Sequence, residues 1–206
     1  GDSDKENLEV RTWGEPTKFN FTPKSHVELM QDLGIVDLER GVKVSGFRGY
    51  FLKGDGALLQ FARFQFVLDT MVTKGFTPII APSLVRREPF MGTGYIPQSE
   101  EDLYKTQDEF YLAGTSEVST MGYYMNEVID SSQFPYKFIA YSPCFRREIG
   151  THGKDTKGLI RVHEFYKLEQ VVLCPADHQE SVKYHEELTT NSEEILQALK
   201  LPHHTV

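Results

Sequence analysis

The chain has 206 residues, of which 39% are apolar and 25% are charged, a composition typical of folded globular domains that excludes a disordered or collagen-like chain. Its formal net charge of −8 repels a polyanion, so contact with a nucleic acid would require a local basic patch or a separate module. The sequence has no run of ~20 apolar residues suited to a membrane helix and no apolar signal segment near its N-terminus, so we expect no membrane partner.

Four elements are predicted in the first part of the chain. The spacing of apolar residues predicts helices over Pro23–Leu33 and Ala57–Lys74, each followed at once by a glycine that can end it. Between them, Gly49–Lys53 is typical of a short strand and Gly54–Gly56 of a turn. Phe76–Ala81 is a short apolar strand whose proline favours the edge of a sheet.

The second part of the chain predicts a long β-hairpin between two helices. Thr115–Asn126 is expected to be a helix with its first residue as N-cap. Tyr136–Glu148 and Leu159–Leu173 are strand-like, and the Gly-, Lys- and Thr-rich segment Ile149–Gly158 is expected to form the loop between them. Pro175–Leu199 is a polar, helix-forming tail. Strands with flanking helices predict an α+β domain built on an antiparallel sheet.

The predicted hairpin carries alternating polar and aromatic residues. Because alternate residues of a strand share a face, one face should collect Arg146 and Glu148 from the first strand and Arg161, His163, Phe165, Lys167 and Glu169 from the second. Guanidinium groups suit phosphate and carboxylate oxygens. An aromatic ring can stack on a purine, and carboxylates accept hydrogen bonds from amines and hydroxyls.

These residue types predict a cleft for a small zwitterion together with a nucleotide. The sequence contains neither GxGxxG nor GxxxxGK[ST], so a nucleotide would have to bind through side chains on the surface of a sheet. Spacing alone leaves a second interpretation equally open, because alternating charge is also typical of the solvated face of any half-exposed strand.

The histidines and cysteines do not predict a metal site or a disulfide. His203 and His204 are adjacent and are interpreted as part of a solvated tail, and no histidine has the spacing of a metal ligand. Cys144 and Cys174 lie in strand-like apolar segments. Two such cysteines suit a reducing cytoplasm, and we expect a cytoplasmic location.

The segment Cys144–Gln170, CFRREIGTHGKDTKGLIRVHEFYKLEQ, closely resembles motif 2 of class II aminoacyl-tRNA synthetases in the form found in the seryl-tRNA synthetase family. Three further segments agree in order. Gly75–Pro82 is similar to motif 1, Met91–Pro97 to the loop after it, and Leu112–Val118 to the serine-binding segment. The resemblance begins near Leu33 and covers most of the chain.

The resemblance implies the roles of two sets of residues. Arg146 and Arg161 are the expected catalytic residues. Arg146 would contact the α-phosphate during attack by the serine carboxylate, and Arg161 would lie near that carboxylate and the phosphates. Glu148 would meet the adenine amino group, and Phe165 would stack on the adenine ring. The implied ATP-binding set is Arg146, Arg147, Glu148, Arg161, Val162 and Phe165.

The resemblance also implies an amino-acid pocket and a contact with tRNA. Thr115 and Glu117 would bind the serine ammonium group, and Glu169 would accept from the serine hydroxyl. Lys154 and Lys157, in the predicted loop, would approach the acceptor end of tRNA. The implied serine-binding set is Thr115, Ser116, Glu117, Arg161 and Glu169.

Two parts of the family pattern do not occur in residues 1–206: the helical tRNA-binding arm and motif 3. We therefore expect the N-terminal part of a class II catalytic core, with motifs 1 and 2, truncated before motif 3. The implied activity is that of a serine–tRNA ligase using ATP, with Mg²⁺ bound through the ATP, on L-serine and tRNA(Ser). The intact protein is expected to be a homodimer, and this portion weakly active or inactive.

Two other functions remain open from the sequence. One is a paralogue that loads an amino acid onto a carrier protein, which the absent tRNA arm favours. The other is a catalytically silent, synthetase-like binding module, against which the intact Arg146 and Glu148 argue.

Overall fold

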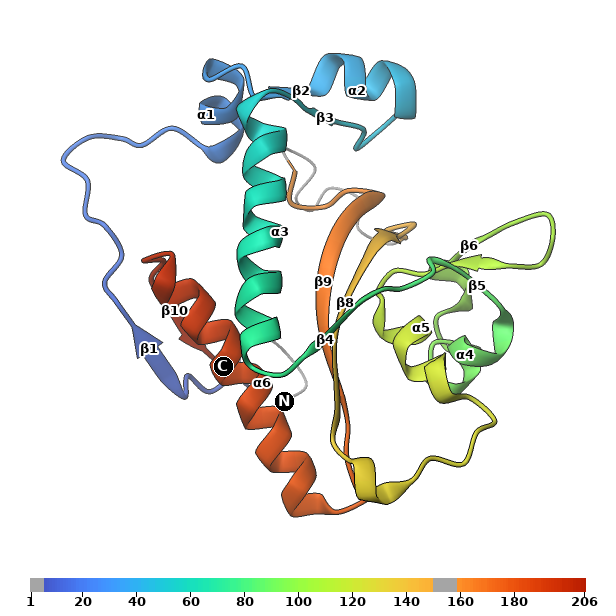
Figure 1. Ribbon diagram of the computed structural model, residues 1–206. Helices are drawn as coiled ribbons and strands as arrows, with labels where there is room; N and C mark the ends of the chain where they lie inside the picture. The colour runs from blue at the N-terminus through green and yellow to red at the C-terminus, as the bar shows by residue number, and fades with distance from the viewer. Residues whose placement is uncertain (1–5, 150–158) are drawn as a thin grey trace. The chain divides into compact units, whose positions relative to one another are not determined.

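The computed structural model (Figure 1) describes residues 6–149 and 159–206. The chain divides into two compact units, one formed by Lys24–Cys174 and the other by Gly1–Pro23 together with Pro175–Val206. Among the described residues, no helix is both long enough and apolar enough to cross a membrane.

A three-stranded sheet forms the centre of the larger unit. Its order is β4 (Thr77–Ile80), β8 (Tyr136–Phe145) and β9 (Glu164–Leu173). β9 pairs antiparallel with β8 along ten residues, whereas β4 pairs parallel with β8. Because β8 lies between two strands, three consecutive residues of it, Phe138, Ile139 and Ala140, are buried. The expected antiparallel pairing holds for the hairpin, and the proline-containing strand lies at an edge of this sheet, as predicted.

The long helix α3 (Asp55–Thr73) packs against this sheet (Figure 1). Phe64 meets Tyr141 of β8 edge to face, with 5.5 Å between ring centroids, and Met71 is fully buried. The chain turns at Gly54, as predicted, and the amide of Gly56 donates to Lys53 O at 3.1 Å. Asp55 and Gly56 already belong to α3, whose N-cap is Gly54 with a φ of 52°. Only a small residue fits at Gly56, since a Cβ there would lie 2.6 Å from the carbonyl oxygen of Ile35.

Four short elements of the larger unit precede α3 in the sequence. They are α1 (His26–Asp32), capped by Ser25, then β2 (Val36–Asp37), α2 (Leu38–Ser45) and β3 (Phe51–Leu52), with β2 and β3 antiparallel. The backbone after α2 runs directly against the helix. A Cβ on Gly49 would lie 2.4 Å from the carbonyl oxygen of Gly41, so both positions require glycine.

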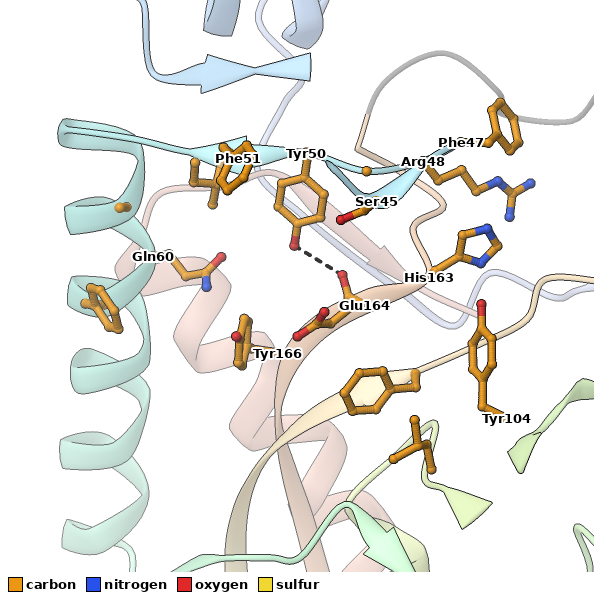
Figure 2. A pocket seen from close by; sticks show the side chains of 16 residues that line it. Ser45, Phe47, Arg48, Tyr50, Phe51, Gln60, Tyr104, His163, Glu164 and Tyr166 are labelled. Carbon is orange, nitrogen blue, oxygen red and sulfur yellow. Dashed lines mark hydrogen bonds between the residues drawn. The ribbon is translucent and has the colours of Figure 1, made fainter. Parts of the chain in front are cut away.

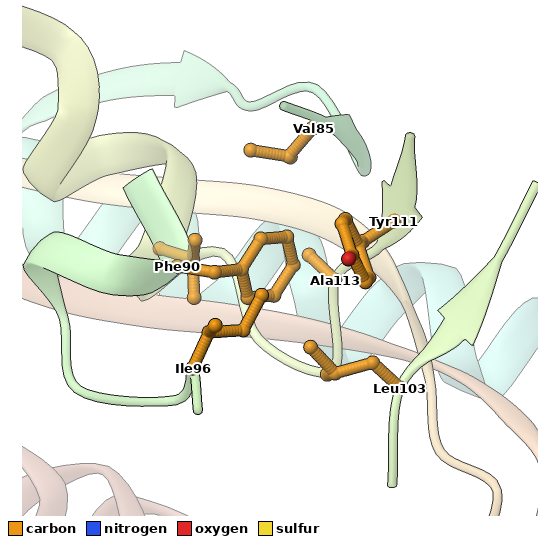
Figure 3. Close-up of a cluster of buried hydrophobic side chains, with 7 residues drawn as sticks. Val85, Phe90, Ile96, Leu103, Tyr111 and Ala113 are labelled. Carbon is orange, nitrogen blue, oxygen red and sulfur yellow. The ribbon is translucent and has the colours of Figure 1, made fainter. Parts of the chain in front are cut away.

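A second small sheet and two short helices enclose a separate hydrophobic cluster (Figure 3). The sheet order is β5 (Leu84–Val85), β7 (Tyr111–Leu112) and β6 (Tyr104–Lys105), and the helices are α4 (Arg87–Gly92) and α5 (Glu117–Met121). Three one-turn 3₁₀ helices, η2 (Glu100–Asp102), η3 (Gly122–Tyr124) and η4 (Ser131–Gln133), lie in the connections. The cluster comprises Val85, Phe90, Ile96, Leu103, Tyr111, Ala113 and Val118.

Thr115 is not the N-cap of the helix that follows it. The helix α5 begins at Glu117 after Ser116. Residues just before it continue the sheets instead, because the amide of Ala113 donates to Ser83 O and the amide of Phe145 donates to Ala113 O. This pairing keeps Thr115 in a non-helical segment.

The smaller unit is built on α6 (His178–Ala198), which Asp177 caps by accepting from two main-chain amides. In the same unit, β1 (Arg11–Trp13) pairs antiparallel with β10 (His203–Thr205). The interpretation as a solvated tail was therefore wrong for the backbone and for His203, whereas the side chain of His204 is exposed. The imidazole of His203 stacks on Trp13 at 5.7 Å between ring centroids.

Candidate active site

The polar residues of the predicted hairpin gather where β8 ends and β9 begins. Both strands are shorter than predicted, since β8 ends at Phe145 and β9 starts at Glu164. One further pair continues the ladder. The amide of Arg146 donates to His163 O at 2.9 Å, and Nδ1 of His163 lies 2.9 Å from Arg146 O. Beyond this pair the two chains diverge.

Strand alternation therefore does not position Glu148 or Arg161, and that part of the prediction was wrong. Glu148 has a φ of 55°, in the left-handed region, which breaks the extended chain after β8. Without that pairing partner, the chain from Leu159 to His163 is not a strand either. Both side chains reach the same cavity from irregular segments.

That cavity, which we call the nucleotide cavity, has a volume of about 550 Å³. Five of the six residues predicted to bind ATP line it, namely Arg146, Glu148, Arg161, Val162 and Phe165. Met30, Leu52, Gln60 and Arg63 contribute to its walls from α1, β3 and α3. The structure thus brings most of this predicted set together.

Arg146 lies over the ring of Phe165 and beside the loop that precedes α5. Its guanidinium carbon is 5.1 Å from the centroid of Phe165, and its Nε donates to Gly114 O at 3.3 Å. The close approach depends on the absence of a side chain at Gly114, where a Cβ would lie 3.3 Å from Cγ of Arg146. The cation–π contact and the hydrogen bond together fix the direction of this guanidinium.

The carboxylate of Glu148 lies between two arginines. Arg161 donates from Nη1 to Oε2 of Glu148 at 3.2 Å, and Nη1 of Arg48 lies 3.5 Å from the same oxygen. The side chains of Arg48 and Glu148 are only 5% and 10% exposed. Two cations thus lie against one buried carboxylate oxygen, and they offset the cost of burying its charge. No pattern in the sequence pointed to Arg48.

A second polar cluster, which we call the threonine cluster, joins β9 to the segment before α5. Lys167 Nζ donates to Oγ1 of Thr115 at 2.7 Å, and this hydroxyl donates to Oε2 of Glu169 at 2.9 Å. Lys167 and Glu169 also form an ion pair. These two residues are two positions apart on β9 and so share a face, as predicted. The sequence analysis had placed Lys167 on this face without giving it a role.

Tyr95 lies near charged groups of both the threonine cluster and the nucleotide cavity. Burial raises the pKa of its phenol, and the charges of Glu117 and Glu169 raise it further, whereas the charge of Arg146 lowers it. All three charged groups are therefore close enough to affect one phenol. An adjoining cavity of about 390 Å³ is lined by Tyr95, Gly114, Arg146 and Glu148 among others, so Arg146 and Glu148 face both cavities.

Two predicted site residues point elsewhere. Arg147 donates from Nη1 to Glu101 O at 2.8 Å and does not line the nucleotide cavity. Ser116 is fully buried, and its hydroxyl donates to Ala140 O at 3.2 Å. Lys154 and Lys157 lie outside the described residues. Within residues 6–149 and 159–206, no group of three or more His, Cys, Asp or Glu side chains is arranged to hold a metal ion.

A third cavity, of about 420 Å³, lies beside the nucleotide cavity and is rich in Phe and Tyr side chains, so we call it the aromatic cavity (Figure 2). Arg48 and His163 line it, and the hydroxyl of Tyr50 donates across it to Glu164 O at 3.3 Å. It shares four wall residues with the nucleotide cavity: Tyr50, Leu52, Gln60 and Tyr166. The sequence analysis did not predict this cavity.

Residues 100–206 match the tRNA synthetase class II core domain family (G, H, P, S and T), and the chain belongs to that family. Within it, the chain is similar to serine–tRNA ligases over its whole length. It is 46% identical to the serine–tRNA ligase of Deinococcus radiodurans and 44% identical to that of Fusobacterium nucleatum, in each case over 100% of this chain and 49% of the relative. It thus spans about half the length of the curated relatives it matches.

Two solved structures agree with this relationship. The cytoplasmic serine–tRNA ligase of Naegleria fowleri, in complex with AMP, has a TM-score of 0.93 and 33% identity, covering 99% of this chain and 49% of the other. The seryl-tRNA synthetase of Pyrococcus horikoshii, complexed with ATP, has a TM-score of 0.91 and 37% identity, covering 99% and 50%. The predicted α+β fold and the predicted family are confirmed.

Proposed function

We propose that residues 1–206 form the ATP- and serine-binding part of the catalytic core of a serine–tRNA ligase. One observation carries this proposal: Arg146 lies between a cavity that contains Phe165 and Glu148 and the polar cluster of Thr115 and Glu169. An aminoacyl-adenylate has a purine at one end, an amino acid at the other, and a phosphate between them. The residues lie in the same order, with Phe165 and Glu148 for the purine, Arg146 for the phosphate, and Thr115 and Glu169 for the amino acid.

In the proposed first step, a carboxylate oxygen of serine attacks the α-phosphorus of ATP. A phosphorus–oxygen bond forms to serine, the bond to the β-phosphate oxygen breaks, and pyrophosphate leaves. Charge on the phosphoryl oxygens is stabilised by Arg146 and Arg161. Positioning and electrostatic stabilisation are sufficient for such a transfer, so no protein nucleophile is required.

Adenine would be recognised by Phe165 and Glu148. The ring of Phe165 supplies an aromatic surface for stacking. The ionised carboxylate of Glu148 accepts a hydrogen bond from an exocyclic amino group but repels a carbonyl oxygen. We infer that Val162, buried in the wall of the same cavity, contributes main-chain contacts, and that Mg²⁺ enters with the phosphates of ATP.

Serine would be recognised by the threonine cluster with Glu117. The ammonium group of serine meets Thr115 and Glu117, and its hydroxyl donates to Glu169. A site built to bind a hydroxyl rejects an analogue without it by a factor on the order of 10⁴, because a buried polar group is left unpaired. Alanine and glycine are therefore excluded by the missing hydroxyl.

In the proposed second step, a ribose hydroxyl at the 3′ end of tRNA(Ser) attacks the seryl carbonyl carbon and AMP leaves. This step belongs to the whole protein, which we propose acts in the cytoplasm. Residues 1–206 are proposed to supply motifs 1 and 2 of its core. The predicted approach of Lys154 and Lys157 to the acceptor end of tRNA remains a prediction.

We also propose that the intact protein is a homodimer. Leu58, Leu59 and Phe61 of α3 are each about two-thirds exposed, and a helix face of this kind favours burial against another chain. Light scattering should detect a dimer whose dissociation is promoted by Leu59→Glu. A wild-type chain that stays monomeric at high concentration would contradict this proposal for residues 1–206.

The proposed function is tested by titrating this chain calorimetrically with a non-hydrolysable seryl-adenylate analogue, seryl-sulfamoyl adenosine, and with its alanyl and glycyl counterparts. We expect binding of the seryl compound and much weaker binding of the other two. A preference for the alanyl or glycyl compound would favour a carrier-protein ligase, and no binding of any of them would favour a silent module. Either result would overturn the proposal.

A further inference from the structure

We propose that Arg48 is a positioning residue for Glu148 and that it controls, through this carboxylate, the selection of the 6-amino group of adenine. This inference rests on the proposed ATP site. Arg48 does not line the nucleotide cavity; it lines the neighbouring aromatic cavity (Figure 2). It therefore acts on a nucleotide only through Glu148.

The two arginines at Glu148 differ in their surroundings. Arg161 is 39% exposed and lines the nucleotide cavity, whereas Arg48 is 5% exposed and does not. Solvent screens a charge less when it is buried, so Arg48 exerts the more constant field on the carboxylate. In the proposed mechanism Arg161 also contacts phosphates, and that would weaken its hold on Glu148. The ion pair with Arg48 holds the carboxylate in place in both situations.

The position of Arg48 is set by a rigid backbone. The helix α2 ends at Gly46, which has a φ of 76°, and Arg48 itself has a φ of 66°. The tight contact between Gly41 and Gly49 fixes the segment that follows. The ring of Phe47 lies 5.3 Å from the guanidinium carbon of Arg48. A left-handed conformation is strained for a non-glycine residue and persists only where its surroundings enforce it.

Glu148 has the same unusual backbone conformation as its partner. Its φ of 55° turns the side chain away from the direction that strand alternation would give it. Two left-handed charged residues thus meet at one buried ion pair. Strained backbone of this kind is found at binding and catalytic sites, where it fixes a group in one orientation. Here the group so fixed is a carboxylate that can accept from an amino group.

The test compares two nucleotides that differ only at the purine 6-position. ATP carries an amino group there, and purine riboside 5′-triphosphate carries hydrogen. Calorimetric titration of wild-type chain and Arg48→Met should show that the variant loses about tenfold to a hundredfold in ATP affinity, the range for a hydrogen bond to a charged group. The affinity for purine riboside triphosphate should change by less than about twofold.

Two further variants make the comparison selective. Arg40→Met removes an exposed arginine of α2 that pairs with Asp37, and it should leave both affinities unchanged. In the double variant Arg48→Met/Glu148→Gln, the preference for ATP should be no weaker than in Glu148→Gln alone, because Arg48 acts only through Glu148. If Arg48→Met does not fold, as judged by circular dichroism, Arg48→Lys serves instead and should lose part of the same preference.

The outcomes separate this inference from the function on which it rests. Equal losses of affinity for both nucleotides, or none for ATP, would overturn the role of Arg48 and leave the ATP site intact. A wild-type chain that binds no ATP would overturn the proposed function and the inference together.

Discussion

Lys167 donates a hydrogen bond of 2.7 Å to the hydroxyl of Thr115, a residue 52 positions away in the sequence. The same hydroxyl donates a hydrogen bond to Glu169, so one threonine contacts both a cation and an anion. A hydroxyl can accept and donate at once, which neither partner could do in its ionised form. In the threonine cluster, a neutral hydroxyl therefore helps to hold both Lys167 and Glu169 in place.

Replacing Lys167 should weaken binding of the serine part of the adenylate and spare the nucleotide part. In Lys167→Met, Thr115 and Glu169 lose the cation that orients them, and affinity for seryl-sulfamoyl adenosine should fall about tenfold to a hundredfold. ATP affinity, measured by the same calorimetry, should be nearly unchanged. Lys183→Met is the control, since Lys183 lies exposed on α6 and pairs with Glu180. Similar losses for both ligands would contradict the assignment.

Thr115 offers a test of the hydroxyl itself. Thr115→Val keeps the shape of the side chain but removes the group between Lys167 and Glu169, and it should lower the free energy of unfolding by about 1 kcal/mol. Thr115→Ser retains the hydroxyl and should lose less than half of this. Urea denaturation followed by circular dichroism measures both. A valine variant as stable as the serine variant would argue against the network.

Gly49 should not tolerate a side chain. A Cβ at this position would lie 2.4 Å from Gly41 O and 2.8 Å from Cβ of Ser45, so Gly49→Ala must shift backbone atoms. Urea denaturation should give a loss of at least about 2 kcal/mol in unfolding free energy. Gly92→Ala is the matched control, because a Cβ there meets nothing within 4 Å. Equal stability of the two variants would show that the contact relaxes easily.

The carboxyl of Glu100 should make the unfolding free energy of the chain depend on pH in the acidic range. A hydrogen bond from Tyr111, of 2.5 Å, lowers the pKa of the Glu100 carboxyl below its usual 4.5, and a hydrogen bond from Arg87 adds to this. A carboxyl with a lowered folded-state pKa stabilises the fold above its unfolded-state pKa. This contribution is lost as the pH falls through the folded-state value.

The variant Glu100→Gln should therefore be less stable than the wild-type chain at pH 7, and the difference should shrink below about pH 4.5. Urea denaturation at several pH values measures this, with Glu101→Gln, an exposed neighbour, as the control. A difference that stays constant from pH 7 to pH 3 would rule out the contribution of this carboxyl.

Local patterns in the sequence predicted the parts of the site that regular structure positions. Lys167 and Glu169 follow strand periodicity, so their shared face could be inferred from spacing alone. Helix periodicity predicted α3 as an element, but the residues that it buries are Gly56, Phe64 and Met71. No pattern in the sequence predicted the left-handed backbone at Glu148. Because the strands end before these positions, Glu148 and Arg161 lie outside β8 and β9. Thr115 was taken for a helix cap because its hydroxyl suits that role; pairing of Ala113 with Phe145 delayed the helix instead.

Arg48 could not be predicted, for a different physical reason. Its sequence context, a glycine-rich turn, carries no sign of a partner 100 positions away. Long-range pairing of side chains depends on how complete elements pack, which periodicity does not describe. Arg147 and Ser116 show the reverse case, since both were included in the predicted site but their side chains bond elsewhere. Arg147 donates to a neighbouring loop and Ser116 to the buried strand β8, which a motif match does not reveal.

The pairing of β4 and β9 on either side of β8 has a consequence for the order in which the molecule folds. The cavities need contacts between distant parts of the chain, such as that of Tyr50 with Glu164, which are 114 positions apart. Contacts of this kind carry a high loop-closure entropy and form after local helices such as α3. Capture of a nucleotide should thus be among the last properties acquired on refolding, appearing only when the hairpin has docked.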